Sequence, residues 1–361
     1  MTHSEIREKF LKFFESRGHK IVPSSSLLPT DPSVLFTTAG MQQFKPYYTG
    51  EADAMKDFGS LNTASVQKSF RTSSIDEVGD DSHLTFFEML GNFSFGGYWK
   101  KEAIQYGYDF ITKEMGLEID YVTVFEGESG IPADEESEQI WKLIDSDLKI
   151  KRLGREDNFW GPTGEEGPCG PSTEIFVKGI KYEIWNLVFN EFYCSKDKKY
   201  TPLETKGMDT GMGLERLASA VQKRENIFET DLLQPIIDAL PTADTNQKRK
   251  RIIADHARAS TFLISDGIVP SNKEQGYVLR RLLRRMIVQA HLGSSGSFSG
   301  IDTLSMGAKV DIDRVFEIIN KIYWDFYPNL NIEKVQEIFG DEFNKFNKVF
   351  KQGLKEIKNA D

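Results

Sequence analysis

The sequence is poor in several features that define large classes of proteins. It has only two cysteines, Cys169 and Cys194, which are too few for a disulfide scaffold and too far apart for a zinc knuckle. None of its apolar runs approaches the ~18 residues of a membrane span. Its beginning, MTHSEIREKF, lacks the apolar core of a signal peptide. These absences exclude a disulfide-stabilised secreted protein and a membrane protein, so the reducing cytoplasm is the expected location.

Common motifs for nucleotides and metals are also missing. The P-loop pattern GxxxxGK[ST] and the dinucleotide turn GxGxxG do not occur, so any use of ATP requires another architecture. The five histidines never fall within four residues of one another, which excludes HExxH and HxxxH sites. They are His3, His19, His83, His256 and His291. We therefore expect no protein-bound zinc.

Positive charge is in deficit. The 361 residues include 45 Lys and Arg against 55 Asp and Glu, which gives a net charge of −10. This balance excludes a non-specific DNA-coating protein, whose affinity depends on neutralising many phosphates. It remains compatible with a nucleic-acid partner that is held by one local basic face. The length suggests two domains, at roughly 100–200 residues per domain.

The patterns along the chain indicate an α+β part followed by a helical part. Residues 2–14 carry a capping box and an apolar stripe at helical spacing, which predict a first helix. Strand-like runs and glycine-rich turns then follow one another closely, which favours an antiparallel sheet. The polar stretch PTADTNQKRKR, which begins at Pro241, marks a boundary, and helical patterns come after it. We expect two domains, 1–240 and 241–361.

The segment 276–291, GYVLRRLLRRMIVQAH, is the most informative helix of the sequence. At roughly 100° per residue, its apolar side chains fill one half of the helical wheel and four arginines fill the other. The arginines are Arg280, Arg281, Arg284 and Arg285. No acidic residue lies among them, and like charges one turn apart repel each other. In an acidic chain this face indicates a polyanion, because guanidinium suits phosphate. An ordinary solvated face is the alternative.

Two further groups are weaker signals. DTGMGLER, 209–216, is a glycine-rich turn that opens an amphipathic helix, and glycines allow a ligand to approach the backbone closely. A purely structural turn is the commoner explanation. Phe70 and Arg71 precede a short loop, beyond which lie His83 and Phe87. An arginine beside aromatic rings suits the phosphate and the base of a nucleotide.

Together these segments resemble the class II aminoacyl-tRNA synthetases. The Phe–Arg pair, the loop and the HxxxF strand look like motif 2 of that family, and GMGLER at 211–216 looks like motif 3. The resemblance is strongest to the alanine-specific members, through EIREKFLKFFESRGHKIVPSSSLLP, LFTTAGMQQFKPYY, TFFEMLGNFSFG, DNFW, GPCGPSTEI, EIWNLVF, MDTGMGLER, IADHARASTFLISDGIVPSN and GYVLRRLLRR. These blocks span residues 5 to about 290, and 335–358 resembles the helix that follows. The resemblance implies an antiparallel β-sheet flanked by helices in a catalytic domain, and a mostly helical domain that recognises the tRNA acceptor stem.

The reaction implied by the resemblance has two steps. Alanine attacks the α-phosphate of ATP to give alanyl-adenylate and pyrophosphate, and the alanyl group then passes to the terminal adenosine of tRNA(Ala). By resemblance, Arg71 holds the α-phosphate, whereas Arg216 packs on adenine and approaches the γ-phosphate. Both arginines are the implied catalytic residues. The other implied ATP-binding residues are His83, Phe87, Gly211 and Gly213.

The resemblance also implies sites for alanine and tRNA. Asp209 resembles the carboxylate that receives the amine of alanine, with Trp185 as a wall around the methyl group and Gly211 beside them. Asn272 resembles a residue that reads a G:U pair in the acceptor stem, and the four arginines of 276–291 suit the stem's phosphates. Magnesium is expected only as a complex with the phosphates of ATP.

Ordinary structural roles remain open for several of these residues. They are core packing for Phe87 and Trp185, an ion pair for Arg71, a turn cap for Asp209 and a loop cap for Asn272. The loop between Arg71 and His83 departs from the family because it is short and acidic, which puts its contact with the tRNA end in doubt. Ser73 also stands where the family's motif 2 has a glutamate.

Two alternative functions remain. One is a non-catalytic, synthetase-like RNA-binding protein, and retention of Arg71, Asp209 and Arg216 argues against it. The other is an alanine-activating ligase that loads a carrier protein, and the arginine face with Asn272 argues against that. The sequence stops at Asp361, before the editing and C-terminal oligomerisation domains of the family, so a monomer is expected.

Overall fold

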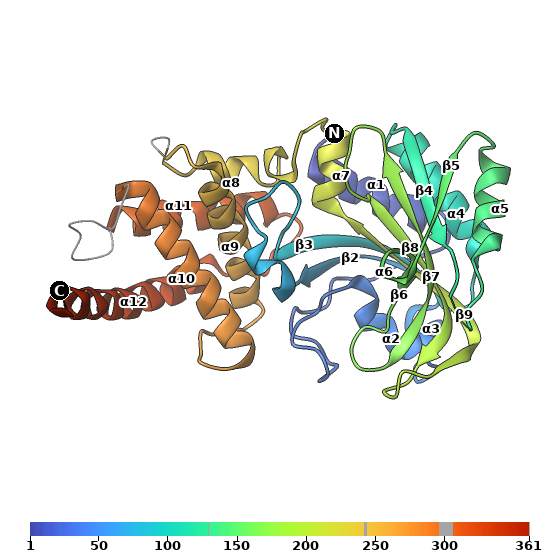
Figure 1. The fold of residues 1–361 in the computed structure, drawn as a ribbon, viewed down its shortest axis with the longest axis horizontal. Coiled ribbons are helices and arrows are strands. Elements are labelled where there is room, and N and C mark those ends of the chain that lie inside the picture. Colours follow the sequence, from blue (N-terminus) through green and yellow to red (C-terminus); the bar gives the residue numbers. More distant parts are fainter. Residues whose placement is uncertain (129, 242–243, 296–305, 361) are drawn as a thin grey trace. The chain divides into compact units, whose positions relative to one another are not determined.

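The computed structural model describes residues 1–128, 130–241, 244–295 and 306–360 (Figure 1). The chain divides into two compact units, 1–69 with 87–225 and 70–86 with 226–361. The short segment 70–86, which contains the loop of the motif 2-like region, therefore clusters with the C-terminal part of the chain. The division at 240/241 into a catalytic and a tRNA-recognition domain is a functional one, and it remains a prediction.

A sheet of nine strands forms the centre of the first unit, counted over the described ranges. The order is β1–β2–β3–β9–β8–β7–β4–β5, and β6 pairs with β7. The strands are β1 Lys20–Ile21, β2 Asn62–Phe70, β3 Phe86–Ser94, β4 Ile119–Phe125, β5 Lys149–Leu153, β6 Phe159–Trp160, β7 Gly167–Val177, β8 Trp185–Cys194 and β9 Tyr200–Gly213. From β3 through β9, β8 and β7 to β4 every pairing is antiparallel. The predicted antiparallel sheet is confirmed, and the pairs β1–β2 and β4–β5 at its two ends are parallel.

Longer helices of the first unit supply apolar side chains to one face of the sheet. They are α1 His3–Glu15, α4 Lys100–Asp109, α5 Glu135–Ile144 and α7 Leu214–Val221. The predicted capping box starts α1, because Thr2 Oγ1 accepts from the Glu5 amide at 3.3 Å and Glu5 Oε2 accepts from the Thr2 amide at 2.7 Å. Arg7 then reaches the sheet through two hydrogen bonds of 2.8 and 2.6 Å to the buried carboxylate of Glu88.

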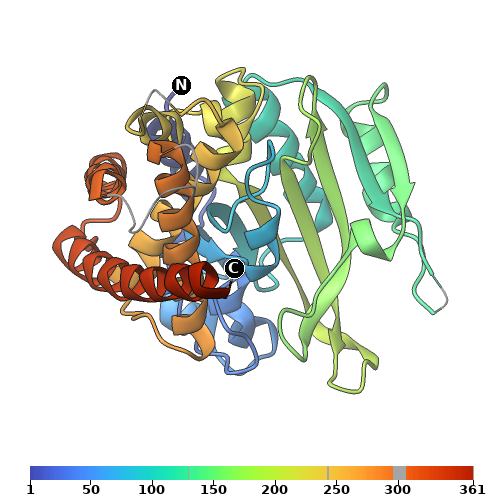
Figure 2. The ribbon, with the colours of Figure 1, turned by 60° about the vertical axis from the view of Figure 1, so that its left-hand side comes forward.

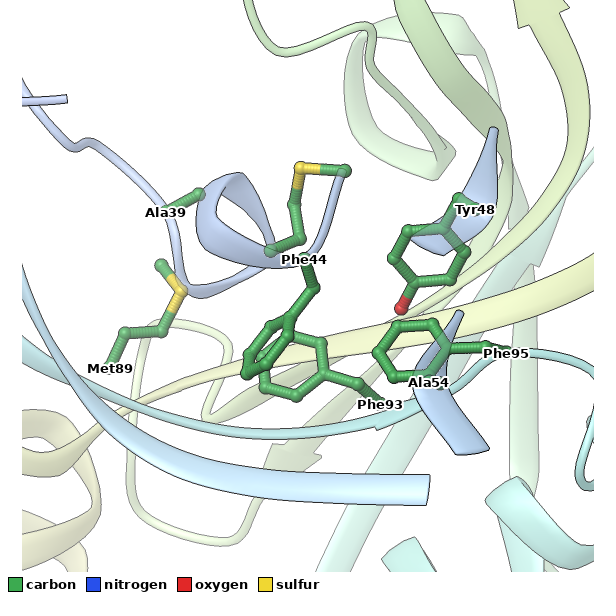
Figure 3. Close-up of a cluster of buried hydrophobic side chains, with 8 residues drawn as sticks. Ala39, Phe44, Tyr48, Ala54, Met89, Phe93 and Phe95 are labelled. Carbon is green, nitrogen blue, oxygen red and sulfur yellow. The ribbon is translucent and has the colours of Figure 1, made fainter. Parts of the chain in front are cut away.

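Short elements pack on the opposite face. The 3-10 turn η1 (Gly40–Phe44) leads into α2 (Lys45–Tyr48), and α3 (Ala54–Phe58) follows. Figure 3 shows their side chains against Met89 and Phe93 of β3 and Phe95 just after it. The centroids of the Phe44 and Phe93 rings are 4.4 Å apart. The remaining short elements of this unit are η3 (Phe110–Glu114), a π-helical turn, and α6 (Arg155–Asn158).

The second unit is mostly helical, as predicted. Its helices are α8 Gln234–Asp238, α9 Gln247–Ser265, α10 Glu274–Ser295, α11 Met306–Tyr323 and α12 Ile332–Ala360, with 3-10 turns η2 Thr72–Asp76 and η4 Ile227–Glu229. The orange and red helices α9 to α12 pack on one another (Figure 2). Of the predicted boundary stretch, 242–243 lie outside the described residues, and the stretch is already helical from Gln247. Among the described helices, none is long and apolar enough to cross a membrane.

Candidate functional site

Strand pairing distributes the candidate residues between the two faces of the sheet. Directly opposite residues of antiparallel neighbours share a face, and successive residues of a strand alternate between faces. Asp209 of β9 lies opposite Val188 of β8 and Phe93 of β3, so these three share a face. Trp185 precedes Val188 by three residues in the same strand and therefore points to the other face.

Asp209 is a buried carboxylate on the face that carries Phe93. Its side chain is 5% exposed, and Asn190 Nδ2 donates to Asp209 Oδ1 at 2.7 Å. Burial raises the pKa of Asp209 to about 7, and the hydrogen bond from Asn190 opposes this shift. Next to it, the buried hydroxyl of Tyr48 donates to the Met208 carbonyl at 2.7 Å. A carboxylate buried in this way gains free energy from a cationic partner, which is what the ammonium group of an amino acid supplies.

Gly211 and Gly213 lie on the same face as Asp209 because they follow it at spacings of two. A Cβ at Gly211 would lie 3.0 Å from Met89 Sδ, so the absence of a side chain lets Met89 pack against this strand. A Cβ at Gly213 would meet only the stem of Arg216, at 3.7 Å. Close packing within the protein thus accounts for glycine at 211, whereas the space at 213 admits a small side chain.

Trp185 lies in the apolar core, away from Asp209. Its ring centroid is 5.6 Å from that of Phe110 and 6.1 Å from that of Phe10, and the side chain is 1% exposed. The structure therefore does not bring Trp185 to the Asp209 carboxylate, and Trp185 packs in the apolar core instead. The sequence predicted Trp185 as the apolar wall beside Asp209. In the structure, Val188 and Phe93 lie opposite Asp209 instead.

Arg216 lies in the first turn of α7 within an acidic group that sequence reasoning missed. Its Nη1 pairs with the Glu183 carboxylate and donates to the Glu183 carbonyl at 3.4 Å. Glu174 is close by: burial first, then the charges of Glu183 and Asp157, raise its pKa to about 8, while Arg216 acts in the opposite direction. Asn186 Nδ2 also donates to Glu174 Oε1 at 3.0 Å. Glu174 and Glu183 lie in the segments GPCGPSTEI and EIWNLVF. Their acidic side chains, within segments that resemble the family, were the signal that the sequence offered.

Phe87 is partly buried against the apolar cluster of Figure 3. Arg71 and His83 belong to the second unit. The Arg71 amide donates to the Thr85 carbonyl at 2.8 Å, which fixes the main chain where the loop begins and ends. His83 faces acids of its own loop, with Nδ1 paired to Asp80 and Nε2 3.4 Å from Glu77. Two acidic side chains of this loop thus contact a histidine of the same loop.

The four arginines of α10 pair with acidic side chains from other elements, which corrects the interpretation of this face as cationic and without acidic partners. Arg281 Nη2 lies 2.6 Å from Asp76 Oδ1, and Arg285 lies 3.6 Å from the same carboxylate and donates to the Ile75 carbonyl. The partner acid comes from η2, in the loop after Arg71, and not from α10 itself. Arg281 is nevertheless 42% exposed and Asp76 78% exposed, so water and salt weaken this pair.

The other two arginines of α10 turn toward α12. Arg284 Nε lies 2.7 Å and Arg280 Nε 3.5 Å from the carboxylate of Glu342, which is 2% exposed. Arg280 also donates to the Asn272 side-chain oxygen and, at 3.3 Å, to the Pro270 carbonyl. The structure therefore brings Asn272 to an arginine of α10, on a surface-exposed loop.

The ion pairs Arg284–Glu342 and Arg281–Asp76 should contribute differently to the free energy of unfolding. We expect Arg284→Gln to lower the free energy of unfolding by about 1–3 kcal/mol, because the buried Glu342 keeps only the longer contact with Arg280. Arg281→Gln, at an exposed pair, should change it by less than about 1 kcal/mol. Urea unfolding followed by circular dichroism measures both, and equal losses in the two variants would contradict this assignment of buried and exposed pairs.

The chain belongs to the class II tRNA synthetases, because the family model described as "tRNA synthetases class II (A)" matches residues 5–360. Over the described ranges, no group of three or more His, Cys, Asp or Glu side chains is placed to hold a metal ion.

Its curated relatives carry a more specific name, alanine–tRNA ligase. The chain is 42% identical over 388 residues to the protein of Thermotoga sp. (strain RQ2), a match that covers 98% of this chain and 42% of the relative. The Rubrobacter xylanophilus protein is 44% identical over 327 residues, with 81% and 37% covered. The Borrelia hermsii protein is 40% identical over 391 residues, with 99% and 63% covered. The chain therefore spans less than two thirds of the length of these relatives.

A solved structure, pyrrolysyl-tRNA synthetase from Desulfitobacterium hafniense, matches with a TM-score of 0.41 and 12% identity over 63% of this chain and 72% of that one.

Proposed function

We propose that this chain activates L-alanine with ATP and transfers it to the 3′-terminal adenosine of tRNA(Ala), in the cytoplasm. The observation that carries the proposal is the buried carboxylate of Asp209, held by Asn190 on the face of the sheet that carries Phe93. The names of the relatives support alanine as the amino acid.

In the proposed alanine site, Asp209 receives the ammonium group. Val188 and Phe93, opposite it on the neighbouring strands, supply apolar surface for the methyl group. Both are buried, at 3% and 0% exposure. Gly211, two residues along, keeps a Cβ from narrowing the same face.

In the proposed ATP site, Arg71 holds the α-phosphate and Arg216 approaches the γ-phosphate, with Phe87 against adenine and His83 and Gly213 nearby. The reaction is an in-line displacement on phosphorus, so placing and neutralising the phosphates carries most of the catalysis. Magnesium bound to the phosphates of ATP would supply part of this charge neutralisation. The carboxylates of Glu174 and Glu183 fit this ion, since their oxygens are the ligands magnesium prefers and their mutual repulsion would fall.

In the proposed tRNA contact, the arginines of α10 meet acceptor-stem phosphates and Asn272 meets the G:U pair. Support comes from the exposure of Asn272 and from the 42% exposure of Arg281. Phosphates would replace Asp76 at Arg281 and Arg285, since a guanidinium fork serves either anion. A monomeric state stays a prediction that sedimentation analysis would test.

The deciding experiment has two stages. Alanine-dependent exchange of pyrophosphate into ATP measures the first step, and charging of tRNA(Ala) with labelled alanine measures the second. The proposal requires both activities. Absence of exchange would favour a non-catalytic RNA-binding protein, and exchange without charging would favour a ligase for a carrier protein.

The alanine site should respond to pH near neutrality. Asp209 binds an ammonium group only when ionised, and its pKa is raised by burial to about 7. Below that value the protonated fraction grows, so the KM for alanine in the exchange assay should rise about tenfold per pH unit once the pH is well below 7. Above it, the KM should level off.

Asn190→Ala provides the matched variant for this measurement. The hydrogen bond from Asn190 lowers the pKa of Asp209, so its removal should move the midpoint of the KM profile to higher pH. A KM for alanine that stays flat between about pH 6 and 8 in both proteins would show that Asp209 does not titrate in the alanine site.

A further inference from the structure

Helix α9 buries three titratable side chains that the proposed reaction does not use. Asp255, His256 and Arg258 are each 0% exposed. Burying a charged side chain is costly unless other groups compensate for lost water. Their partners therefore show what these residues do.

Both oxygens of Asp255 are occupied by a single residue outside the helix. Thr85 donates its amide to Asp255 Oδ1 at 2.8 Å and its hydroxyl to Oδ2 at 2.6 Å. His256 Nδ1 lies 2.9 Å from the same Oδ2. This two-point contact fixes both the main chain and the side chain of Thr85.

Arg258 holds the next residue along the chain. Its Nη2 donates to the Phe86 carbonyl at 2.5 Å, and its Nη1 donates to the Tyr323 hydroxyl of α11 at 3.0 Å. The Phe86 ring also stacks on Phe262 of α9, with centroids 4.1 Å apart and an angle of 10° between planes. Residues 85–86 are thus attached to α9 by two charged side chains and one ring.

The attached residues lead directly to Arg71. The Thr85 carbonyl accepts the Arg71 amide at 2.8 Å, so the main chain at Arg71 is placed by the residue that Asp255 holds. These groups belong to one compact unit of the chain. The connection runs from a buried carboxylate on α9, through the threonine, to the arginine proposed to hold the α-phosphate.

We propose that Asp255 and Arg258 are positioning residues for Arg71 in the activation step. They fix the main chain of Thr85 and Phe86, and through it the direction from which Arg71 meets the α-phosphate of ATP. The inference rests on the proposed function, since it assigns Arg71 that role. An in-line displacement loses much of its rate when a holding group shifts by about 1 Å.

The main test compares the Asp255→Asn variant with the unsubstituted protein in the pyrophosphate exchange assay. Asparagine is isosteric, but it lacks the second acceptor for the Thr85 hydroxyl. We expect kcat/KM for ATP to fall about 10- to 100-fold, while the KM for alanine changes less than about twofold. Asp266→Asn, the same substitution at the end of α9, serves as the control and should leave both constants unchanged.

A double-mutant cycle with Arg71→Ala separates positioning from general stability. If Asp255 acts through Arg71, adding Asp255→Asn to Arg71→Ala should cause less than about a twofold further loss in kcat/KM for ATP. A loss that multiplies in full in the Arg71→Ala background would overturn the inference and leave the proposed function standing. Full activity of Arg71→Ala itself would instead overturn the role of Arg71 in the proposed function, and the inference with it.

If Asp255→Asn fails to fold, Thr85→Val keeps the inference testable, with Tyr323→Phe as its control. Thr85→Val keeps the hydrogen bond from the main-chain amide to Asp255 and removes the one from the hydroxyl. It should therefore cause a smaller loss in kcat/KM for ATP, and this loss should also be absent in the Arg71→Ala background. Tyr323→Phe removes one partner of Arg258 and keeps the Phe86 contact, so it should leave kcat/KM for ATP nearly unchanged. A loss in Thr85→Val that persists without Arg71, or a KM change confined to alanine, would overturn the proposal.

Discussion

Replacing Asp209 by asparagine should abolish alanine activation while ATP binding persists. The ammonium group of alanine would then meet a neutral amide in a buried site, and an unpaired buried charge costs about 3–5 kcal/mol. That cost corresponds to a loss of roughly 100- to several thousand-fold in kcat/KM for alanine. Asparagine can still accept the hydrogen bond from Asn190, so the sheet should keep its structure.

The measurement is alanine-dependent pyrophosphate exchange, with ATP affinity measured separately by calorimetry. Asp209→Ala should lose the same activity, and it additionally leaves the Asn190 amide without its acceptor. Unchanged exchange in Asp209→Asn would remove Asp209 from the alanine site. Equal losses of ATP and alanine binding would point to a disturbed fold instead.

Breaking the Arg281–Asp76 pair from its two sides should have opposite effects on tRNA binding. Arg281→Glu removes a phosphate contact and adds a negative charge, so tRNA affinity should fall about tenfold and its salt dependence should weaken by about one unit of slope. Asp76→Asn frees the guanidinium from its competitor, so affinity should rise about threefold. Both variants lose the same 2.6 Å ion pair.

Filter binding of tRNA over a range of salt concentrations measures both effects, and pyrophosphate exchange is the control that each variant should pass. If the pair served only to hold the loop after Arg71, the two substitutions would change tRNA affinity in the same direction. That result would make the exposed half of the arginine face a structural feature and not a phosphate site.

Much of the fold was accessible from the sequence because local patterns determine it. The capping box at Thr2, the antiparallel succession of strands and the helical C-terminal part are confirmed. The side on which Trp185 lies was also readable. In WNLVFN, 185–190, Trp185 shares its alternation with Leu187 and Phe189, and the polar Asn186 and Asn190 mark the opposite face.

The ion pairs of α10 could not be read from the helix. Asp76 lies 205 residues from Arg281, and Glu342 lies 58 residues from Arg284. A helical wheel shows only neighbours within a few residues, so it could not reveal either partner. The same limit applies to Asp255, whose contact with Thr85 joins residues 170 positions apart.

The attachment of residues 85–86 to α9 has a consequence for dividing the chain into fragments. A piece that begins at residue 241 would retain Asp255 and Arg258 but lack Thr85 and Phe86, which leaves two charges inside the protein without these partners. A piece that ends at residue 240 would retain the loop of 70–86 but lose the helix that holds it. The predicted boundary at 240/241 is therefore a poor place to divide the chain. Independent folding of the helical part depends on residues 70–86, which the sequence places between strands β2 and β3.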